Sequence, residues 1–428
     1  MNQRFRGPLG NQDGILTIGG VAATELFEKY GTPLYVTDES TIRSNFRALK
    51  EAFKRNYGKV RIYYSMKANS NISILRILLS EGSFLDATSP GEIYLGLKAG
   101  FPSHRILYTG TSVSDEDLEF AVKMNVAINV DSRSQFERLL KIKVPDLISV
   151  RLNPGVGSGH HKHVVTGGVG SKFGLTAREA LEVYRMAKAE GVSKFGFHMH
   201  IGSGILTIEP YLTALKNLLD LVVEAKNIIG VKPEFIDIGG GVGVPYRPED
   251  PEFPLNEFTF EVSRLIKEYD ARHELGGPTL CVEPGRFIVC DSTVLLTKIN
   301  DVKVSEAGRF IGVDAGFNIL IRPAMYGSYH EILPASKLNE PVIHECYIVG
   351  PLCESGDVFG RYRMPHLSEG DLLAILNAGA YGFSMSSQYN ARPRPAEVLV
   401  KNGSHEVVRE REGFDDLLKG QRMASWLR

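Results

Sequence analysis

Short apolar runs alternate with longer amphipathic segments between residues 41 and 286. Runs rich in β-branched and aromatic residues predict strands at 60–65, 84–87, 105–109, 127–130, 147–152, 194–199, 234–238 and 279–282. Apolar residues at helical spacing predict helices at 41–53, 72–79, 90–99, 115–124, 134–142, 177–189, 208–229 and 256–272. Because strands and helices alternate in about eight units, the pattern predicts an α/β fold with a closed (β/α)8 barrel of the TIM type.

The pattern changes to β-rich runs after residue 287. These runs lie at 289–304, 310–313, 342–349, 372–376, 397–400 and 406–409. Strands expected at 14–18 and 33–36 precede the barrel, and we expect them to pair with the β-rich part. The expected domains are therefore N-terminal strands (1–36) that belong to the β domain, the barrel (37–286) and a C-terminal β-rich domain (287–428).

Composition narrows the class of protein. The chain has 428 residues, of which 43% are hydrophobic and 23% charged, and its formal net charge is −1. With no basic run, we expect no binding to nucleic acid or to an anionic membrane. No stretch is apolar enough to span a bilayer and the N-terminus lacks a signal-peptide core, so we expect a cytoplasmic protein. The cysteines are far apart without a C-x-x-C pair, which predicts reduced thiols.

Lys67 carries the first candidate chemistry. It follows the apolar run at 60–65, and Asn71 then looks like the N-cap of the next helix, so the lysine occupies a strand-to-helix corner. A lysine there is either a reactive amine, desolvated or held as an imine with an aldehyde, or an ordinary lysine that reaches solvent or pairs with a carboxylate. The residues at the other strand ends help to decide between a reactive and an ordinary Lys67.

Polar and glycine residues end several of the other predicted barrel strands. They are Asp86, Arg151, His198 to Ser203, Gly239 to Gly241, and Glu283 to Arg286. Barrel enzymes gather such residues on one face, which favours a reactive Lys67. Glycine-rich loops after the last two strands of a barrel often bind phosphate. A phosphorylated aldehyde, pyridoxal 5′-phosphate, would satisfy both features.

Histidines raise two further alternatives. His198 and His200 share a strand face, as metal ligands do in barrel hydrolases, but no other ligand cluster follows, so we expect no metal and favour ring stacking by His200. The glycine-rich loop at 155–174, with His160, His161 and His163, is either a lid over the site or a surface loop with incidental histidines.

Several motifs, in order along nearly the whole chain, resemble a known family. They are Tyr64–Asn69, His198–Gly204, Gly239–Gly241, Glu283–Arg286, Asp314–Asn318, Arg322–Tyr326, Gly350–Asp357 and Gly379–Gly382. The first four resemble fold type III pyridoxal-phosphate decarboxylases, and the last four resemble the diaminopimelate decarboxylase family within that group. The resemblance implies a lyase that converts meso-2,6-diaminopimelate to L-lysine and CO2, the last step of lysine biosynthesis.

The resemblance also implies how the cofactor is held. Lys67 would form the imine, His200 would stack on the pyridine ring, and Glu283 would keep the pyridine nitrogen protonated. The residues implied to contact the phosphate are Ser203, Gly239, Gly240, Gly241, Gly285, Arg286 and Tyr381. Asp86 and Arg151 are candidates for an ion pair near Lys67 and the phenol oxygen. A structural salt bridge at the barrel mouth would have the same residues.

Substrate recognition is implied to combine both signs of charge. Arg286, Arg322, Tyr326 and Tyr381 would contact the substrate, with the arginines on its distal carboxylate, and Glu354 would bind the distal ammonium. Cys353 would reprotonate the α-carbon. The resemblance implies a homodimer in which Cys353 and Glu354 come from the partner subunit.

Three other functions remain open at this stage. An amino-acid racemase shares this fold but has an arginine where Glu283 stands. Some decarboxylase relatives only bind regulators, although the combination of Lys67, Glu283 and Cys353 argues against this. A metal-dependent barrel hydrolase would be colourless and sensitive to chelators.

Overall fold

The computed structural model describes residues 7–159, 166–168 and 170–427. They divide into two compact units. The barrel unit consists of Ile42–Pro245 and Glu249–Val289, and the β unit consists of Met1–Thr41, Tyr246–Pro248 and Cys290–Arg428.

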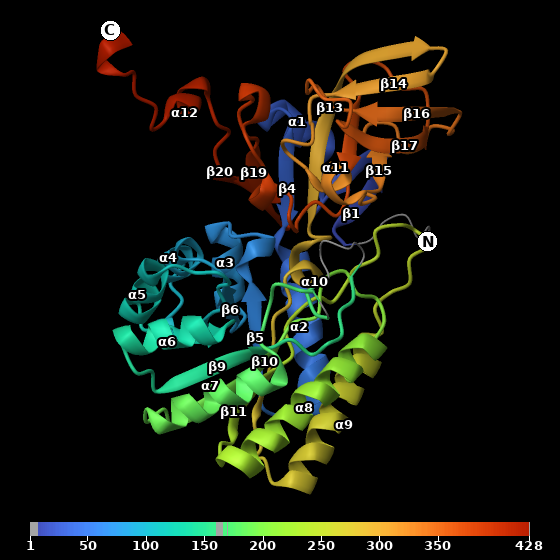
Figure 1. Cartoon of the computed structure of the whole chain (residues 1–428). Coiled ribbons are helices and arrows are strands. Elements are labelled where there is room, and N and C mark those ends of the chain that lie inside the picture. Colours follow the sequence, from blue (N-terminus) through green and yellow to red (C-terminus); the bar gives the residue numbers. More distant parts are fainter. Residues whose placement is uncertain (1–6, 160–165, 169, 428) are drawn as a thin grey trace. The chain divides into compact units, whose positions relative to one another are not determined.

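The barrel unit contains a closed barrel of parallel strands, which confirms the predicted fold class (Figure 1). Its strands are β5 (Val60–Ser65), β6 (Phe84–Ala87), β7 (Ile106–Tyr108), β8 (Ala127–Val130), β9 (Leu147–Leu152), β10 (Lys194–Met199), β11 (Pro233–Asp237) and β12 (Thr279–Val282). They pair in chain order, and β12 returns to pair with β5. The carboxyl ends of all these strands therefore lie at one end of the barrel.

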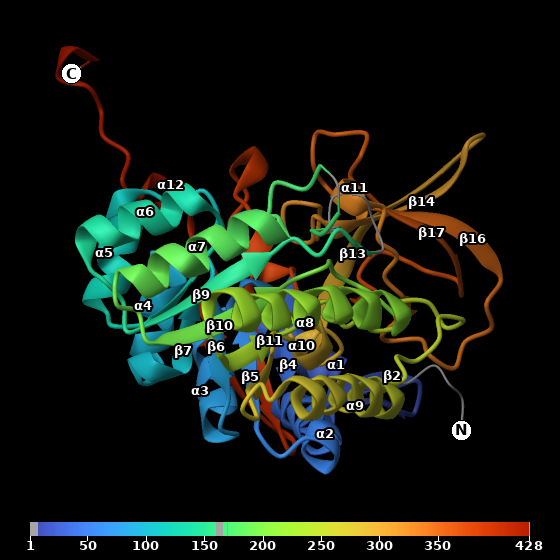
Figure 2. The same cartoon turned by 60° about the horizontal axis from the view of Figure 1, so that its bottom comes forward.

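Helices form the outer layer of the barrel unit (Figure 2). They are α2 (Glu39–Asn56), α3 (Ile72–Ser80), α4 (Pro90–Lys98), α5 (Asp115–Lys123), α6 (Arg133–Ile142), α7 (Ala177–Ala189), α8 (Glu209–Ile229) and α9 (Leu255–His273), with the short α10 (Arg286–Val289) after β12. The predicted N-cap of α3 is confirmed, since the Asn71 side chain accepts a hydrogen bond from the Ser73 N–H at 2.9 Å. A single 3-10 turn, η1 (Met66–Ala68), separates β5 from this cap and holds Lys67 at the carboxyl end of β5.

The β unit contains two sheets that include the N-terminal strands. One sheet has the order β1-β2-β3, and the other runs β17-β16-β14-β13-β4-β19-β20 with β18 and β15 branching from β13. The strands are β1 (Leu9–Gln12), β2 (Ile15–Ile18), β3 (Val21–Ala22), β4 (Leu34–Asp38), β13 (Thr293–Ser305), β14 (Gly308–Val313), β15 (Ile332–Pro334), β16 (His344–Val349), β17 (Val358–Met364), β18 (Leu372–Ile375), β19 (Ala396–Lys401) and β20 (Ser404–Arg409). Its helices are α1 (Ala23–Tyr30), α11 (Arg322–Tyr326) and α12 (Phe414–Leu418). As predicted, β4 joins the C-terminal sheet, between β13 and β19.

Remaining single turns of 3-10 helix are η2 (Ser103–Arg105), η4 (Phe383–Met385), η5 (Tyr389–Ala391) and η6 (Ser425–Leu427).

Two of the predicted strands in the C-terminal part begin later than expected. The apolar run at 289–304 was expected to be one strand, but β13 begins only at Thr293. Residues 286–289 form α10, which includes the first residue of that run, and the Ile288 N–H donates to the Gly285 carbonyl at 3.1 Å. Ile288 and Val289 are buried, and burial rather than strand pairing explains their apolar character. Strand β16 likewise begins at His344 rather than at residue 342.

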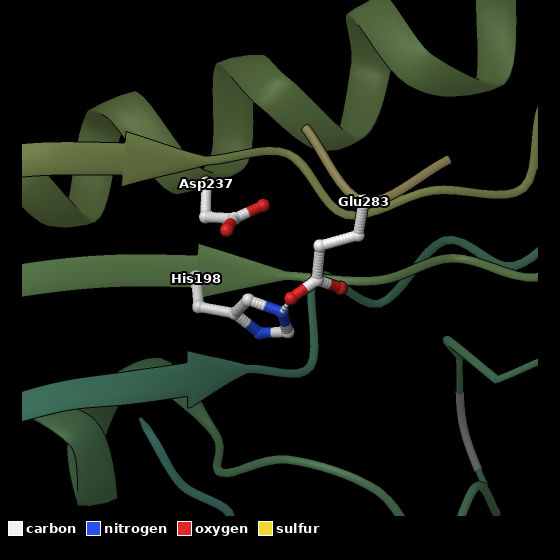
Figure 3. Close-up of side chains that lie close together, drawn as sticks. All are labelled: His198, Asp237 and Glu283. Carbon is white, nitrogen blue, oxygen red and sulfur yellow. Dashed lines mark hydrogen bonds and ion pairs between the residues drawn. The ribbon is translucent and has the colours of Figure 1, made fainter. Parts of the chain in front are cut away.

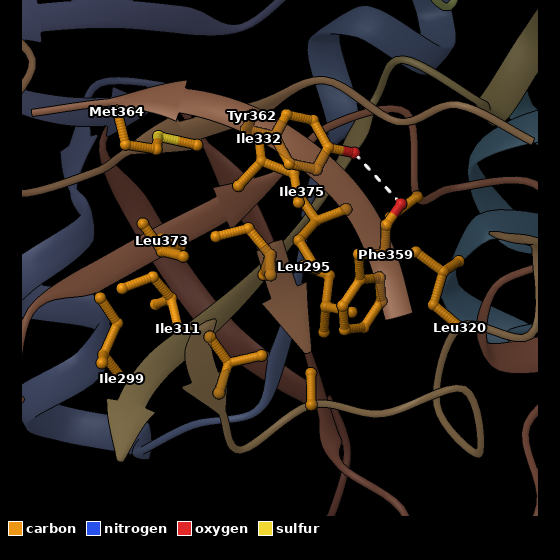
Figure 4. Close-up of a cluster of buried hydrophobic side chains, with 14 of the residues drawn as sticks. Leu295, Ile299, Ile311, Leu320, Ile332, Phe359, Tyr362, Met364, Leu373 and Ile375 are labelled. Atoms are coloured by element: carbon orange, nitrogen blue, oxygen red, sulfur yellow. Dashed lines mark hydrogen bonds between the residues drawn. The ribbon is translucent and has the colours of Figure 1, made fainter. Parts of the chain in front are cut away.

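A large apolar core stabilises the β unit (Figure 4). Buried side chains from β13, β14, β17 and β18 pack together there, and the Tyr362 hydroxyl donates to the Phe359 carbonyl within the cluster at 3.3 Å. Such packing fixes the loops that leave the sheet. Among the described residues, no helix is long and apolar enough to cross a membrane.

Candidate active site at the barrel mouth

Lys67 lies beside a buried carboxylate, Asp86 of β6. Its Nζ donates to Asp86 Oδ2 at 3.0 Å, and the Ser65 hydroxyl donates to the same oxygen at 2.8 Å. The Thr109 hydroxyl donates to Oδ1. Burial opposes ionisation of Asp86, but the Lys67 charge and these hydroxyl donors outweigh it and lower the pKa of the carboxyl. The pair therefore holds a charged amine at the carboxyl end of the barrel, with 38% of the lysine side chain exposed.

Arg151 of β9 does not pair with Asp86. Its Nη1 lies 3.7 Å from Asp131 Oδ1, and its guanidinium lies over the Phe173 ring at 4.7 Å. Burial lowers the pKa of Arg151, while Asp131 and the other carboxylates oppose that shift. The predicted pairing of Asp86 with Arg151 is thus replaced by two separate ion pairs on neighbouring parts of the barrel mouth.

His200 follows β10 and has a fixed ring orientation. Its Nδ1 accepts a hydrogen bond from the Gly240 N–H at 3.1 Å, which assigns the ring proton to Nε2. Burial and the positive charges of Arg151 and Lys67 hold the pKa of His200 well below its usual value. The ring is therefore a neutral, half-buried imidazole, which suits stacking on an aromatic ligand.

The glycine run after β11 is required by close backbone contacts. A Cβ on Gly240 would lie 1.9 Å from the Glu283 carbonyl oxygen. Gly241 has φ +97°, and a Cβ there would lie 2.4 Å from the Gly202 carbonyl oxygen. The loops after β10, β11 and β12 thus pack backbone against backbone. Within the described residues the Gly241 N–H has no acceptor, which leaves a donor for an anion.

Ser203 and Arg286 meet beside this glycine run. Arg286 is buried at the start of α10, and its Nη2 donates to the Ser203 hydroxyl at 3.0 Å. Gly285 allows the turn before α10 to pack on β5, because a Cβ on it would lie 3.0 Å from the Ala68 Cβ. A hydroxyl and a guanidinium held together in this way are typical anion donors.

Glu283 belongs to a buried group of three side chains (Figure 3). Its Oε1 lies 3.2 Å from His198 Nε2, and Asp237 of β11 completes the group, in which one polar atom of each residue lies within 4.8 Å of the others. His198 thus points to Glu283 rather than acting together with His200. Asp237 was not among the predicted site residues, although an aspartate inside the apolar run Phe235–Ile238 was a usable signal.

The described part of the 155–174 loop is tied to the end of β10. Thr166 donates to the His200 carbonyl through its hydroxyl at 3.2 Å, and the Ser158 N–H donates to the Ile201 carbonyl at 3.0 Å. His160, His161 and His163 lie outside the described residues, so the choice between a lid and a surface loop stays a prediction.

In the β unit, Arg322 is 1% exposed and begins α11. Its Nη1 donates to the Tyr246 hydroxyl at 2.7 Å and to His330 Nε2 at 3.0 Å, and its Nη2 donates to the Ser328 hydroxyl at 3.1 Å. A guanidinium has five N–H donors, so the Nε–H and one Nη2–H have no acceptor among the described residues. Nε and Nη2 share one edge of the guanidinium, the edge on which arginine binds the two oxygens of a carboxylate.

Cys353 and Glu354 occupy an exposed turn of the β unit. The Cys353 N–H donates to the Asn390 side chain at 2.9 Å, and the Tyr389 hydroxyl donates to Glu354 Oε1 at 2.7 Å. Buried Asp357 closes the turn by accepting from the Leu352 N–H at 2.8 Å.

The other two predicted substrate residues, Tyr326 and Tyr381, are half-buried in the β unit. Tyr326 ends α11, and Tyr381 has φ +58°.

All four cysteines are free, as expected, and Cys353 is the exposed one.

The barrel mouth fits the phosphorylated aldehyde that the sequence predicts. Lys67 supplies an amine, and the neutral ring of His200 offers a stacking face. A Cβ would fill the space beside the backbone at Gly240 and Gly241, where the Gly241 N–H has no acceptor among the described residues. A buried carboxylate, Glu283, lies at the neighbouring strand end. Amine, ring, anion donors and acid are the groups that pyridoxal 5′-phosphate requires.

Comparisons with known proteins agree with this fit. Residues 39–290 match the family model "Pyridoxal-dependent decarboxylase, pyridoxal binding domain". The chain is 54% identical to the diaminopimelate decarboxylase of Methanothermobacter thermautotrophicus, over 97% of this chain and 98% of the relative. It is 42% identical to the diaminopimelate decarboxylase of Archaeoglobus fulgidus, over 97% of this chain and 99% of the relative.

A solved structure is similar over the same length. It is the diaminopimelate decarboxylase of M. jannaschii in co-complex with L-lysine, which has a TM-score of 0.91 and 35% sequence identity and covers 98% of this chain and 99% of the other.

Proposed function

The chain belongs to the diaminopimelate decarboxylase family of pyridoxal-dependent decarboxylases, and we propose that it converts meso-2,6-diaminopimelate to L-lysine and CO2. This is the last step of lysine biosynthesis. The observation that carries the proposal is that an amine, Lys67, and a buried carboxylate, Glu283, follow the ends of adjacent strands of one barrel.

Bound pyridoxal 5′-phosphate supplies an acceptor for the electron pair that remains on the α-carbon when CO2 departs. In our proposal Lys67 would hold the cofactor through Nζ, and Asp86 would hold that nitrogen in place. His200 would stack its neutral ring on the cofactor. Glu283 would face the pyridine nitrogen and favour its protonated form, which withdraws electrons more strongly and so favours decarboxylation.

We further propose that the phosphate binds where the loops after β10, β11 and β12 meet. The proposed donors are the Gly241 and Gly285 N–H groups, Ser203 and Arg286, with Tyr381 adding its hydroxyl. Gly239 and Gly240 shape the same loop, and their N–H groups donate to Asp237 and His200. The donor left on Gly241 and the Arg286–Ser203 contact support this placement. In this scheme Arg151 affects the site through its charge and not by direct contact, since it forms an ion pair with Asp131.

The distal end of the substrate carries a carboxylate and an ammonium. We assign the carboxylate to the edge of Arg322 that has two donors left, with Arg286, Tyr326 and Tyr381 as further contacts. Decarboxylation at one centre leaves the other centre intact, so L-lysine retains this carboxylate. We assign the ammonium to Glu354, which Tyr389 orients.

Cys353 and Glu354 are exposed, and we propose that each reaches the barrel of a second subunit in a homodimer. Cys353 would then protonate the α-carbon after CO2 leaves. In this scheme residues 37–286 hold the cofactor, while residues 1–36 and 287–428 supply substrate contacts, and the enzyme works in the cytoplasm. Mixing Lys67→Ala with Cys353→Ala should restore activity, because each heterodimer has one intact site. No recovery after proven subunit exchange contradicts the shared site.

The reaction itself is tested by incubating the protein with meso-2,6-diaminopimelate and pyridoxal 5′-phosphate in deuterated water. We expect stoichiometric CO2 and L-lysine with one deuterium at the former α-carbon. Deuterium incorporation into recovered substrate without CO2 would identify a racemase and refute the proposal. A rate that disappears with chelator and not with removal of the cofactor would instead identify a metal-dependent hydrolase.

A further inference from the structure

We propose that the Asp237 carboxyl remains protonated in the folded protein and so holds the proton of the buried group that it forms with Glu283 and His198. This inference deepens the proposed function, because it explains how Glu283 stays available to the pyridine nitrogen. Asp237 is then a positioning residue that has no contact with substrate.

The group is built by strand register. His198 of β10 is the register partner of Asp237 of β11, and Asp237 is in turn the partner of Cys281 of β12. Glu283 follows β12 directly. Figure 3 shows the Asp237 carboxyl directed toward the side on which Glu283 and His198 meet. The three residues are between 0 and 3% exposed, so water does not screen their charges.

Two carboxylates this close cannot both ionise easily without water. One polar atom of each lies within 4.8 Å of the other, and at that separation, with water excluded, like charges raise the pKa of one partner. The group as a whole therefore retains a proton, and its hydrogen bonds decide which carboxyl keeps it.

Hydrogen bonding assigns the proton to Asp237. Its Oδ1 accepts from the Gly239 N–H at 2.8 Å, but its Oδ2 is buried and has no partner among the described residues. A buried anionic oxygen with no donor is far more costly than the hydroxyl of a neutral acid. Glu283, by contrast, has a polar partner within the group, His198 Nε2 at 3.2 Å from its Oε1.

The surroundings favour the same assignment. The titratable groups around Asp237 are Tyr63 on β5, Lys67 after β5, Asp86 on β6, His198 on β10, and Cys281 and Glu283 at β12. Lys67 is the cation among them, and Asp86 already pairs with it. Burial, followed by the Glu283 charge, raises the pKa of Asp237 well above its usual value. Burial also raises the pKa values of Tyr63 and Cys281, so neither adds a further negative charge.

Infrared spectroscopy tests the proton without the cofactor. Apoprotein containing aspartate labelled with ¹³C at the side-chain carboxyl should show, at neutral pH, a protonated-carboxyl stretch that is absent from Asp237→Asn. The amide of this variant keeps an oxygen for the Gly239 N–H. If the spectra of wild type and Asp237→Asn show no difference in that region, Asp237 is ionised and the inference is overturned.

Stability against pH gives a second, independent readout. The folded-state pKa of Asp237 is raised, so wild type should lose stability relative to Asp237→Asn as pH rises above the unfolded value. The loss is about tenfold in the folding equilibrium per pH unit until the folded pKa is reached. Asp86→Asn is the matched control with opposite sign, because the pKa of Asp86 is lowered. The same slope for both variants contradicts the inference.

The role of Glu283 is tested separately with the holoenzyme. Glu283→Gln should weaken cofactor binding by about tenfold or more, since it leaves the pyridine nitrogen without an anion. Its absorption band should also respond differently to pH. If Glu283→Gln binds the cofactor as tightly as wild type and its absorption has the same pH dependence, the proposed role of Glu283 is refuted. The protonation of Asp237 would still stand if wild-type apoprotein shows the protonated-carboxyl stretch that Asp237→Asn lacks.

Discussion

Replacing Arg322 with lysine should remove most of the preference for ligands that carry the distal carboxylate. Arg322 donates three hydrogen bonds to Tyr246, His330 and Ser328, which leave its Nε–H and one Nη2–H without an acceptor among the described residues. A lysine ammonium retains the charge at this position but not the paired donors. The perturbation therefore acts on the geometry of carboxylate binding.

The size of the effect follows from the two donors. Hydrogen bonds between charged groups contribute about 1.5–3 kcal/mol each, and the ammonium recovers part of that total. We expect a net loss of about 2–4 kcal/mol, which corresponds to a factor of roughly 30 to 700 in affinity. The partners of Arg322 also lose hydrogen bonds, so the fraction of folded protein will fall.

A pair of ligands separates recognition from folding. L-lysine retains the distal carboxylate of the substrate, and cadaverine is the same molecule without it. The inhibition constant of cadaverine divided by that of L-lysine, measured on one preparation, is independent of the folded fraction. This quotient should decrease by the factor given above in Arg322→Lys. It should stay near the wild-type value in Ser328→Ala, which removes one structural hydrogen bond. A wild-type ratio in Arg322→Lys would refute the assignment of the carboxylate to Arg322.

Further predictions concern the barrel unit. Asp86→Asn should lower the free energy of unfolding of the apoprotein by about 1–3 kcal/mol at neutral pH, because one of its three donors then faces an amide N–H. Since the pKa of Asp86 is lowered in the folded state, this loss of unfolding free energy should vanish as the pH falls through that folded-state pKa. Urea titrations followed by circular dichroism at several pH values measure it. A loss that stays constant with pH contradicts the ion pair. Gly240→Ala should abolish cofactor absorbance in the refolded protein, because its Cβ would lie 1.9 Å from the Glu283 carbonyl oxygen; normal absorbance would disprove the close packing. Asn71→Ala should destabilise the protein by about 1 kcal/mol through loss of the α3 cap, whereas the exposed control Asn402→Ala at a hairpin turn should not affect α3 amide exchange.

The barrel was predictable from sequence because its strands are buried on both faces. Such strands are short, continuous apolar runs, and each is followed by a helix whose start has a local signal such as Asn71. Strand β17 was missed for the opposite reason. Its sequence, Val358–Met364, contains a glycine and two arginines, and its buried residues, Phe359, Tyr362 and Met364, do not alternate regularly with exposed ones. Its pairing with β16 depends on partners that are distant in sequence.

The candidate site was predictable as a set of strand ends but not in its pairings. Lys67, Asp86 and Arg151 were identified, yet the sequence alone could not show that Asp131 takes Arg151. Pairing depends on which strand ends are adjacent and on how far each side chain reaches, and register decides both. The same applies to Asp237, whose significance appears only when β10 and β12 lie on either side of it.

Locating the cofactor after chemical reduction tests the central claim most directly. Borohydride added to the holoenzyme should fix pyridoxal phosphate to the protein and bleach its visible absorbance, and peptide mapping should then place the label on Lys67. Lys67→Ala should show no label under the same conditions. Label on another lysine, or protein without stoichiometric label, would contradict the account.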